Sequence, residues 1–427
     1  MIKLVAPRGT ADIFPPQSAR WQELETRIHD LARRFGYAEI RTPIFEAIEL
    51  FVRGVGESTD IVEKEMYAFK DKGERHMALR PEWTAPVVRA LLQHDLLAAG
   101  ARRLYYLGPI FRYERPQAGR LRQSHQFGVE CFGFEDALAD VEIIQLAWEL
   151  VAQYNVSGAT LEINSIGDAA CRPRYKQSLL EHFQPHYGQL TADSQRRLER
   201  NPLRILDSKA EADQSFLNDA PAFVDFLCEP CRAHFEEVKT ALSIIGIPYR
   251  LNPKIVRGLD YYTRTVFEIV SSTLGAQSTV CGGGRYDDLV SSLGGPPTPA
   301  AGFALGLERF LMISDAAPQS RAAQRSGIAL IALGVQSRKA LFPLLAQLRR
   351  TLRVPVFMDY DDRKLLPQLK AADRQNARHA LIMGAQEHEA GEVLLRDLLT
   401  REDRRLPFVR AADAVRSLVE AGIDGRA

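Results

Sequence analysis

The stretch GPIFRYERPQAGRLRQSHQFGVECFG, from Gly108 to Gly133, is typical of two β-strands joined by a basic loop. Side chains of a strand alternate between its two faces. In the first strand this alternation sets Arg112 and Glu114 on one face, opposite Phe111 and Tyr113. The strand is therefore expected to have one polar and one apolar face.

The return strand repeats this pattern, with Gln126 and Glu130 opposite Phe127 and Val129. Four polar side chains of the two strands then converge on one face of the sheet. The alternative is an ordinary amphipathic hairpin with a solvated charged loop. That alternative explains the loop, but it does not explain why four polar side chains converge on one face. We therefore interpret the polar face as a binding site.

The connection between the strands carries three guanidinium groups, Arg115, Arg120 and Arg122. It is too polar to bury and too long for a tight hairpin turn. Arginines on such an arm favour an anionic partner. The alternative is a charged loop that contacts only solvent.

The 427 residues, 26% charged and 46% hydrophobic, predict a soluble globular protein of two or three domains. No apolar run reaches the ~20 residues that span a bilayer, and the first residues lack the apolar core of a secretory signal. We expect a cytoplasmic protein with no membrane partner. The net charge of +1 carries no information about nucleic acid.

Five cysteines scattered over the chain do not indicate a disulfide framework. Cys228 and Cys231 form a C-x-x-C pair, but the sequence has no second Cys or His pair at zinc spacing. Reduced thiols on a helix surface are the expected state, and no metal site is predicted.

The segments before the hairpin predict a helix and two short β-regions. The helix carries an apolar stripe and ends at Gly36. Tyr37–Phe45 is expected to be one short edge strand, because Pro43 removes a hydrogen-bond donor. Glu82 follows a second strand where a helix begins, so it is either a binding carboxylate or ordinary compensation of the helix dipole. The residues of the helical stripe are Trp21, Leu24, Ile28, Leu31 and Phe35.

The segments after the hairpin predict a helix over 138–154, a mostly helical insertion over about 168–247, and β-rich runs beyond it. Residues 252–270 hold more hydrogen-bonding side chains than a core strand needs. Three glycines after a strand, Gly282–Gly284, allow close backbone approach to a ligand, but they match neither a dinucleotide fingerprint nor a P-loop. Arg309 lies where a helix should start, a place suited to a triphosphate.

A linker near 316–326 precedes a segment in which strands and helices alternate, which indicates a compact α/β domain. From Gly327 onward 17 Lys and Arg stand against 13 Asp and Glu, a net charge of +4. This excess would suit a modest phosphate-contacting surface, although it is ordinary for any α/β domain.

These segments together resemble the class II aminoacyl-tRNA synthetases, and among them the histidyl-tRNA synthetase family, over essentially the whole chain. The first three segments below match the motifs of the class, and the remainder match the histidine-specific family. The matching segments are RTPIFE around Pro43, FRYE at Phe111–Glu114 with Glu130 on the return strand, GFALGLERF at Gly302–Phe310, LRPE at Leu79–Glu82, RGLDYYTRTVFE at Arg257–Glu268, CGGGRYDDL at Cys281–Leu289, and PQLKAADRQNARHALIMGAQE at Pro367–Glu387.

The resemblance implies an α+β catalytic domain on an antiparallel sheet over residues 1–325, with the helical insertion inside it. It also implies a C-terminal α/β anticodon-binding domain over residues 326–427. The activity it implies is ATP-dependent: histidine is activated to histidyl-adenylate and then transferred to the terminal ribose of tRNA(His). The expected partners are histidine, ATP with Mg²⁺ on its phosphates, tRNA(His) and a second copy of the chain.

The resemblance also implies roles for individual residues. Arg112, Arg257 and Arg309 would be catalytic, with Glu114 and Arg120 joining Arg112 and Arg309 at ATP. Arg115 and Gln117 would approach the tRNA acceptor end. The histidine site would comprise Glu82, Thr84, Arg112, Gln126, Glu130, Arg257, Tyr261, Tyr262 and Tyr286, of which Glu130 and Tyr262 would face the imidazole.

One position departs from the family, which usually has glycine where this chain has Trp83. The indole either packs away from the site or narrows the histidine pocket. A rival from another functional class is the histidine-binding regulatory subunit of ATP phosphoribosyltransferase, which generally lacks the last domain and the catalytic arginines. A third alternative is a synthetase-like RNA-binding module. The three arginines and the last domain favour the ligase.

Overall fold

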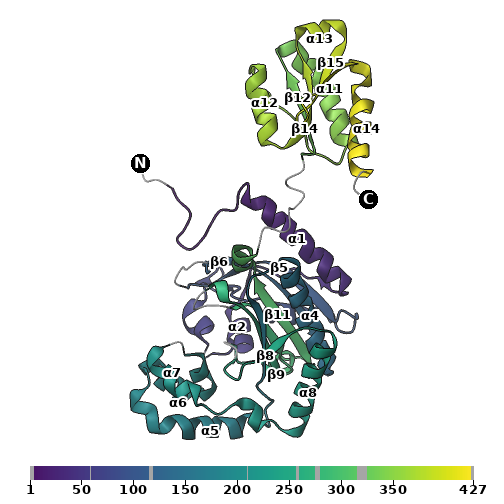
Figure 1. Ribbon diagram of the computed structural model, residues 1–427. Helices are drawn as coiled ribbons and strands as arrows, with labels where there is room; N and C mark the ends of the chain where they lie inside the picture. The colour runs from purple at the N-terminus through teal and green to yellow at the C-terminus, as the bar shows by residue number, and fades with distance from the viewer. Residues whose placement is uncertain are drawn as a thin grey trace. The chain divides into compact units, whose positions relative to one another are not determined.

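The computed structural model forms two compact units, Met1–Pro318 and Gln319–Ala427 (Figure 1). The structure describes residues 4–57, 59–114, 119–208, 210–255, 259–274, 279–314 and 325–424. Among these residues no helix combines the length and apolar character needed to cross a membrane.

The first unit is built on an eight-stranded sheet with the order β1-β5-β6-β11-β10-β9-β7-β8. Neighbouring strands are antiparallel except for the outer pairs β1–β5 and β7–β8. The antiparallel sheet predicted for the first domain is thereby confirmed. The strands are β1 (Ala38–Glu39), β5 (Arg103–Phe111), β6 (Gln123–Phe132), β7 (Ala159–Ser165), β8 (Tyr249–Leu251), β9 (Thr263–Ser271), β10 (Thr279–Arg285) and β11 (Ala300–Gly306).

The predicted hairpin is formed by β5 and β6, and it begins at Arg103 rather than Gly108. The first strand ends at Phe111, so the prediction that Arg112 and Glu114 lie on it is wrong, and both residues follow the strand. The alternation holds in β6, because Phe127 and Val129 are fully buried in the core. Gly128 lies between them, where a Cβ atom would come within 2.3 Å of the Tyr106 ring. Only glycine therefore leaves room at position 128 for the ring of Tyr106, the residue that it faces on β5.

Three helices, α1 (Gln17–Arg34), α4 (Ala137–Gln153) and α8 (Glu229–Ile244), share one hydrophobic core with the apolar side chains of the sheet (Figure 1). In α1 the predicted stripe is confirmed, since Leu24, Ile28 and Leu31 are fully buried. Gly36 follows with φ +76°, the left-handed conformation that glycine adopts without strain. The other helices of this unit are α2 (Ile48–Val55), α3 (Thr84–Gln93), α5 (Arg172–Phe183), α6 (Ala192–Arg200), α7 (Glu211–Asn218), α9 (Leu289–Ser292) and α10 (Leu307–Ile313).

The prediction of a single strand over Tyr37–Phe45 is wrong. β1 joins the large sheet, whereas β2 (Phe45–Ala47) pairs with β4 (His76–Leu79), which also pairs with β3 (Ala68–Lys70). Pro43 lies in the segment that connects β1 of the large sheet to β2 of the small one, and it has no backbone N–H to donate. The carbonyl oxygens of Thr42 and Pro43 instead accept hydrogen bonds from the Arg80 guanidinium, at 2.9 and 3.3 Å.

The insertion lies between β7 and β8 and is mostly helical, as predicted, with α5 to α8 as its α-helices. Its first helix, α5, begins soon after the chain leaves the large sheet at β7, and its last helix, α8, ends shortly before the chain rejoins that sheet at β8. The apolar residues of α5 to α7 belong to a second core, which also includes side chains of α3 and the aromatic residues Tyr106 and Tyr262, whereas most of those of α8 belong to the first core.

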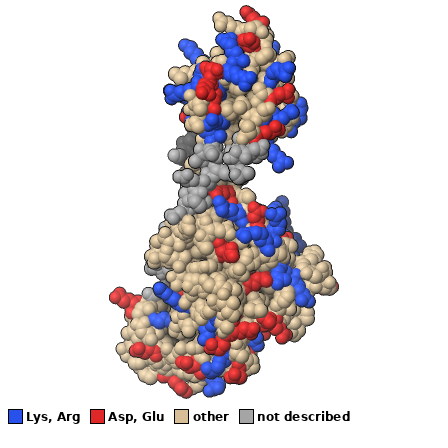
Figure 2. Space-filling view, turned by 45° about the vertical axis from the view of Figure 1, so that its right-hand side comes forward, with Lys and Arg blue, Asp and Glu red and all other residues tan. Residues whose placement is uncertain are grey.

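The second unit contains a five-stranded sheet with the order β13-β12-β14-β15-β16. β12 is parallel to both neighbours, and β15 is antiparallel to its own, so the sheet is partly parallel. The alternation of strands and helices confirms the predicted α/β domain. Figure 2 shows the Lys and Arg side chains of this unit interspersed with acidic ones on the visible face. The elements are β12 (Gly327–Ala332), α11 (Val335–Thr351), β13 (Val356–Met358), α12 (Leu365–Arg374), β14 (Ala377–Met383), α13 (Ala385–Ala390), β15 (Glu392–Asp397), β16 (Asp403–Pro407) and α14 (Ala411–Asp424).

Candidate active site

A cavity of about 330 Å³ opens on the polar face of the β5–β6 hairpin. Its wall includes the start of α3, the segment 259–262, strands β10 and β11 and the start of α10. Arg115, Gln117 and Arg257 lie outside the described residues. The predicted site residues that line the cavity are Glu82, Thr84, Arg112, Glu114, Arg120, Gln126, Tyr261, Tyr262, Tyr286 and Arg309.

Glu130 is not itself part of the cavity lining: it is 1% exposed and lies behind Thr84 and Tyr286, which line the cavity and contact it. Its carboxylate accepts hydrogen bonds from the Thr84 hydroxyl, at 2.7 Å, and from the Tyr286 hydroxyl. Burial raises the pKa of Glu130 to about 8, against the effect of these hydrogen bonds and with a contribution from the charge of Glu82. Burial of Glu130 thus favours the neutral form of its carboxyl group relative to an exposed glutamate.

Glu82 occupies the strand-to-helix junction and is 4% exposed. One carboxylate oxygen accepts from the Thr84 amide at 2.7 Å and the other from the Ala85 amide at 2.9 Å. Burial raises its pKa, although these amides oppose the shift. The carboxylate therefore compensates the first amides of α3, as one of the two alternatives expected, and it also lines the cavity, where its role as a binding carboxylate stays a prediction.

Three tyrosines form an aromatic wall next to these carboxylates. Tyr261 lies 4.8 Å from Tyr262 and 5.5 Å from Tyr286, measured between ring centroids. Burial raises the pKa of Tyr261 and Tyr286 well above the usual value. Both hydroxyl groups therefore remain neutral and can donate hydrogen bonds.

Another part of the cavity lining carries cationic groups. Arg112 donates from Nε to the Pro81 carbonyl at 2.8 Å, and its terminal nitrogen lies 3.9 Å from Glu114. Arg120 pairs with Glu114 at 3.0 Å. Burial, and then the neighbouring charge of Arg120, lowers the pKa of Arg309. Several guanidinium groups around one space suit a ligand with many phosphate oxygens.

Gln126 projects from β6 into the same cavity. Its side-chain oxygen is buried and accepts no hydrogen bond from the described residues. Buried polar atoms normally have partners. The Gln126 oxygen is thus available to an N–H group of a ligand.

Trp83 packs at the edge of the cavity. Its ring stacks on Tyr106 with centroids 4.8 Å apart and planes 8° apart, and the Arg80 guanidinium carbon lies 3.4 Å from the ring centroid on Trp83. A Cβ atom at Gly108 would lie only 3.0 Å from the indole. Packing therefore fixes the indole, and Trp83 is also among the residues that line the cavity.

The three glycines Gly282–Gly284 lie inside β10 and not after a strand as predicted. A Cβ atom at Gly283 would meet the Gly302 carbonyl oxygen at 2.3 Å, and one at Gly284 would meet the Thr265 oxygen at 2.4 Å. Close packing against β9 and β11 therefore accounts for two of the glycines. Only Gly282 of the three lines the cavity.

Arg285 is a framework residue that was not among the residues predicted from the sequence. Its guanidinium is fully buried, 2.9 Å from Asp140, and donates to the Phe134 and Asp136 carbonyls at 2.9 and 3.0 Å. These contacts fix the backbone just before Tyr286. An arginine beside the glycine run was the available signal, but its partner lies 145 residues away in the chain.

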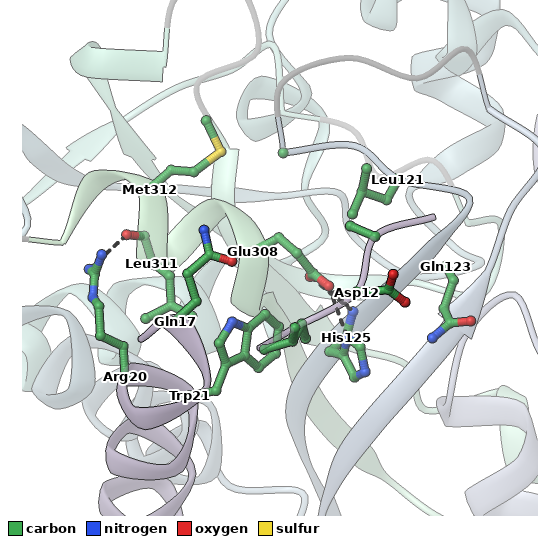
Figure 3. Close-up of a pocket in the computed structure, with 13 residues that line it drawn as sticks. Asp12, Gln17, Arg20, Trp21, Leu121, Gln123, His125, Glu308, Leu311 and Met312 are labelled. Atoms are coloured by element: carbon green, nitrogen blue, oxygen red, sulfur yellow. Dashed lines mark hydrogen bonds and ion pairs between the residues drawn. The ribbon is translucent and has the colours of Figure 1, made fainter. Parts of the chain in front are cut away.

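Glu308 fastens the start of α10 to β6. It accepts from the His125 amide at 3.0 and 2.9 Å and contacts His125 Nδ1 at 2.8 Å. Figure 3 shows this pair beside Trp21, whose ring lies 5.0 Å from the imidazole, in a neighbouring cavity under α1. The contact holds Arg309, the next residue, at the edge of the active-site cavity.

Comparisons with known proteins agree with this geometry. The family model for histidyl-tRNA synthetase matches residues 9–310, and that for an anticodon binding domain matches residues 328–418. A histidine–tRNA ligase of Desulfitobacterium hafniense is 48% identical over 94% of this chain and 95% of its own length. One from Synechococcus sp. is 49% identical over 99% and 98%.

Two solved structures extend the comparison. The apo histidyl-tRNA synthetase of S. aureus is 36% identical, with a TM-score of 0.80 over 97% of this chain and 100% of its own. A Bacillus halodurans structure described as an ATP phosphoribosyltransferase regulatory subunit/histidyl-tRNA synthetase is 21% identical, with a TM-score of 0.65 over 90% and 99%. The second likeness shows the shared fold alone.

Proposed function

The chain belongs to the histidyl-tRNA synthetase family, and we propose that the cavity on the β5–β6 hairpin is where it activates histidine with ATP and charges tRNA(His). The observation that carries this assignment is the meeting of two unlike walls in one cavity. One wall holds buried carboxylates and tyrosines suited to an imidazole and an amino group, and the other holds arginines suited to phosphate. The protein is an ATP-dependent aminoacyl-tRNA ligase.

In the first step an oxygen of the histidine carboxylate attacks the α-phosphorus of ATP. A carboxyl–phosphate anhydride forms, the bond to the bridging oxygen of the β-phosphate breaks, and pyrophosphate leaves. In the second step a hydroxyl of the tRNA terminal ribose attacks the anhydride carbonyl, and AMP leaves. Negative charge collects at the α-phosphorus in the first step, so fixed cations must offset it.

We assign that task to the arginines. Arg112 would hold the α-phosphate and the histidine carboxylate, and Arg309 the outer phosphates, with Glu114 and Arg120 beside the nucleotide. Arg257, outside the described residues, would lie across the α-phosphate by family resemblance. Mg²⁺ would enter on the ATP phosphates, and the carboxylates of Glu114 and Glu268 line the same cavity and offer the oxygen ligands that it prefers.

Selection of histidine would rest on the opposite wall. Glu130 and Tyr262 would contact the imidazole, and Tyr261 and Tyr286 would enclose it. Glu82, Thr84 and Gln126 would receive the amino group. A pocket that pairs both imidazole nitrogens leaves buried groups unpaired when an apolar analogue enters, which discriminates by roughly 10⁴-fold without editing.

The remaining parts of the proposal rest on the family. Arg115 and Gln117 would meet the tRNA acceptor end, residues 1–325 would form the catalytic domain, and residues 326–427 would bind the anticodon. We place the protein in the cytoplasm as a homodimer. The exposed apolar side chains Ile44 and Phe45, next to Pro43, are suited to such an interface. Sedimentation equilibrium of the wild type and of Phe45→Asp tests the dimer: a wild-type monomer would contradict it.

The regulatory-subunit alternative is not favoured, because the relatives at 48–49% identity over nearly the full length are histidine–tRNA ligases. This alternative predicts that the protein binds histidine but does not form histidyl-adenylate from it. The ligase and the regulatory subunit can therefore be separated by a single reaction.

That reaction is the exchange of labelled pyrophosphate into ATP. We expect exchange with histidine and none with the other amino acids, and loss of exchange in Arg257→Ala. Arg33→Ala is the matched control, since Arg33 is 81% exposed on α1. Histidine-independent or absent exchange in the wild type would contradict the ligase, and near-normal exchange in Arg257→Ala would contradict only the role of that residue.

A further inference from the structure

Four side chains of metal-ligand type meet where the helical insertion leaves the large sheet and where its last helix, α8, begins: Asp168, Cys171, Cys228 and Cys231, the cysteine cluster. One ligand atom of each lies within 4.8 Å of those of the other three. Cys228 Sγ lies 3.9 Å from Asp168 Oδ2. The chain between the two halves of the cluster is the insertion itself, so the sequence holds no local sign of this meeting.

The two halves have the same construction. Asp168-x-x-Cys171 precedes α5, and Cys228-x-x-Cys231 spans the start of α8. Gly167, with φ +55°, makes the first turn possible, because a Cβ atom there would lie 2.6 Å from that of Cys171. Each half thus holds two ligands three residues apart at the start of a helix of at least 12 residues.

Backbone amides prepare the cluster for negative charge. The Cys228 amide donates to Cys171 Sγ at 3.1 Å, and the Ala170 and Cys171 amides donate to Asp168 Oδ1 at 3.0 and 3.3 Å. Asp168 Oδ2 then faces Cys228 Sγ. Amides at a helix start stabilise thiolate and carboxylate groups, but three thiolates and a carboxylate held this close repel one another unless a cation joins them.

The composition of the cluster selects the cation. Thiolate ligands in a tetrahedral set favour Zn²⁺, with Zn–S bonds of about 2.3 Å, which places sulfur atoms about 3.8 Å apart. A contraction of roughly 1 Å or less from the observed spacing reaches that geometry. The other two cysteines, Cys131 and Cys281, are buried but do not belong to this group of ligands, so burial of a thiol does not by itself produce such a cluster.

We propose that Asp168, Cys171, Cys228 and Cys231 bind one structural Zn²⁺ that joins the first and last helices of the insertion. The absence of a second Cys or His pair at zinc spacing led the sequence analysis to expect reduced thiols. In the folded chain Asp168 and Cys171 supply that second pair of ligands. In this pair the carboxylate of Asp168 takes the place of a second Cys or His side chain.

The zinc would also brace one wall of the active site. The Arg264 amide donates to the Gly167 carbonyl at 2.7 Å, and the Ile166 amide donates to the Arg264 carbonyl at 2.8 Å. The Arg172 guanidinium, next to Cys171, donates to the Tyr262 carbonyl. Loss of the metal is therefore expected to loosen the segment that carries Tyr261 and Tyr262.

The direct test measures metal in the full-length protein. Wild type, Cys228→Ser and the control Cys131→Ser are produced with zinc in the medium, freed of loose metal by gel filtration and analysed by plasma mass spectrometry. We expect about one zinc ion per chain in the wild type and in Cys131→Ser, and about a tenth of that or less in Cys228→Ser. Circular dichroism verifies that each variant is folded.

Substitution of Co²⁺ for the zinc tests for thiolate ligands in the wild-type protein, without any variant. Zinc removed by a mercurial reagent and replaced by Co²⁺ should produce sulfur-to-metal charge-transfer absorption in the wild type. A wild-type protein with negligible zinc and five reactive thiols, a disulfide within the cluster, or full zinc retention in Cys228→Ser would each overturn the proposal. Metal content is independent of pyrophosphate exchange, so this proposal and the ligase assignment fail separately.

Discussion

Two consecutive residues, Arg285 and Tyr286, belong to two buried clusters with opposite electrostatics. Arg285 pairs with Asp140, which also accepts from His234 at 2.5 Å and from Thr265 at 2.9 Å; these four residues are the ion cluster. Tyr286 donates to Glu130, which also accepts from the Thr84 hydroxyl, and the Thr84 amide donates to Glu82; these four residues, of which all but Glu130 line the cavity, are the cavity floor. Asp140 and Glu130 are equally buried, at 0% and 1% exposure.

The pKa values of the two carboxyl groups separate framework from binding site. Burial raises the pKa of Asp140, but the His234 hydrogen bond and the charge of Arg285 outweigh it and lower the pKa below its usual value. At Glu130 burial prevails and the pKa rises to about 8. In the ion cluster the cation is the guanidinium of Arg285. The cavity floor contains no such cation among its own residues, and the proposed substrate histidine would bring its amino group and imidazole there.

The largest effect is expected from Arg285→Met, which leaves Asp140 buried without its main cation. The free energy of unfolding should fall by about 3–5 kcal/mol. All three tryptophans, Trp21, Trp83 and Trp148, lie in the first unit, so urea unfolding followed by indole fluorescence reports on that unit. Adding Asp140→Leu should recover part of the loss, and Arg33→Met, at an exposed site, should cost little. A loss below about 1 kcal/mol would contradict the framework role.

The pH dependence of stability should have opposite signs in the two clusters. Glu130 binds its proton more tightly when folded than when unfolded, so its contribution to stability is complete below about pH 4.5 and declines as the pH rises toward 8. Between pH 5 and 8 the decline is up to about 4 kcal/mol. The Asp140 contribution is complete above about pH 4 and declines only in stronger acid.

The comparison with Glu130→Gln isolates this effect. Urea unfolding of wild type and variant at pH 5, 6.5 and 8 should show the variant gaining stability relative to the wild type as the pH rises. A constant difference across this range would mean that Glu130 does not titrate there in the folded protein.

The sequence reveals the cavity floor better than the ion cluster, for a physical reason. Strand alternation places Gln126 and Glu130 on one face of β6, and helical periodicity locates α1, because both signals repeat over a few residues. A pair such as Arg285 and Asp140 leaves no periodic trace. The turn at Pro43 and the cysteine cluster depend likewise on contacts between distant segments, which local patterns do not encode.

Glu130→Gln should also weaken catalysis, by an amount smaller than the stability effects. Replacing the carboxylate removes a charge-assisted hydrogen bond to the imidazole, worth about 1.5–3 kcal/mol, or roughly 10- to 150-fold in kcat/KM for histidine. The KM for ATP should change little, because the arginine wall is intact. Pyrophosphate exchange at pH 7.5 measures both, with the exposed Glu236→Gln as the control. An unchanged KM for histidine would remove Glu130 from the imidazole site.

The smallest effect is expected at the hydroxyl that Thr84 donates to Glu130 over 2.7 Å. Thr84→Val preserves the shape of the side chain and deletes this donor, which should cost about 1 kcal/mol of unfolding free energy and raise the pKa of Glu130 further. Thr84→Ser keeps the hydroxyl and loses only a methyl group. If the hydrogen bond matters more than the packing, Ser should be the milder change in urea unfolding. Equal losses in the two variants would assign the effect to the methyl group, and Thr84 would then belong with the framework rather than the cavity floor.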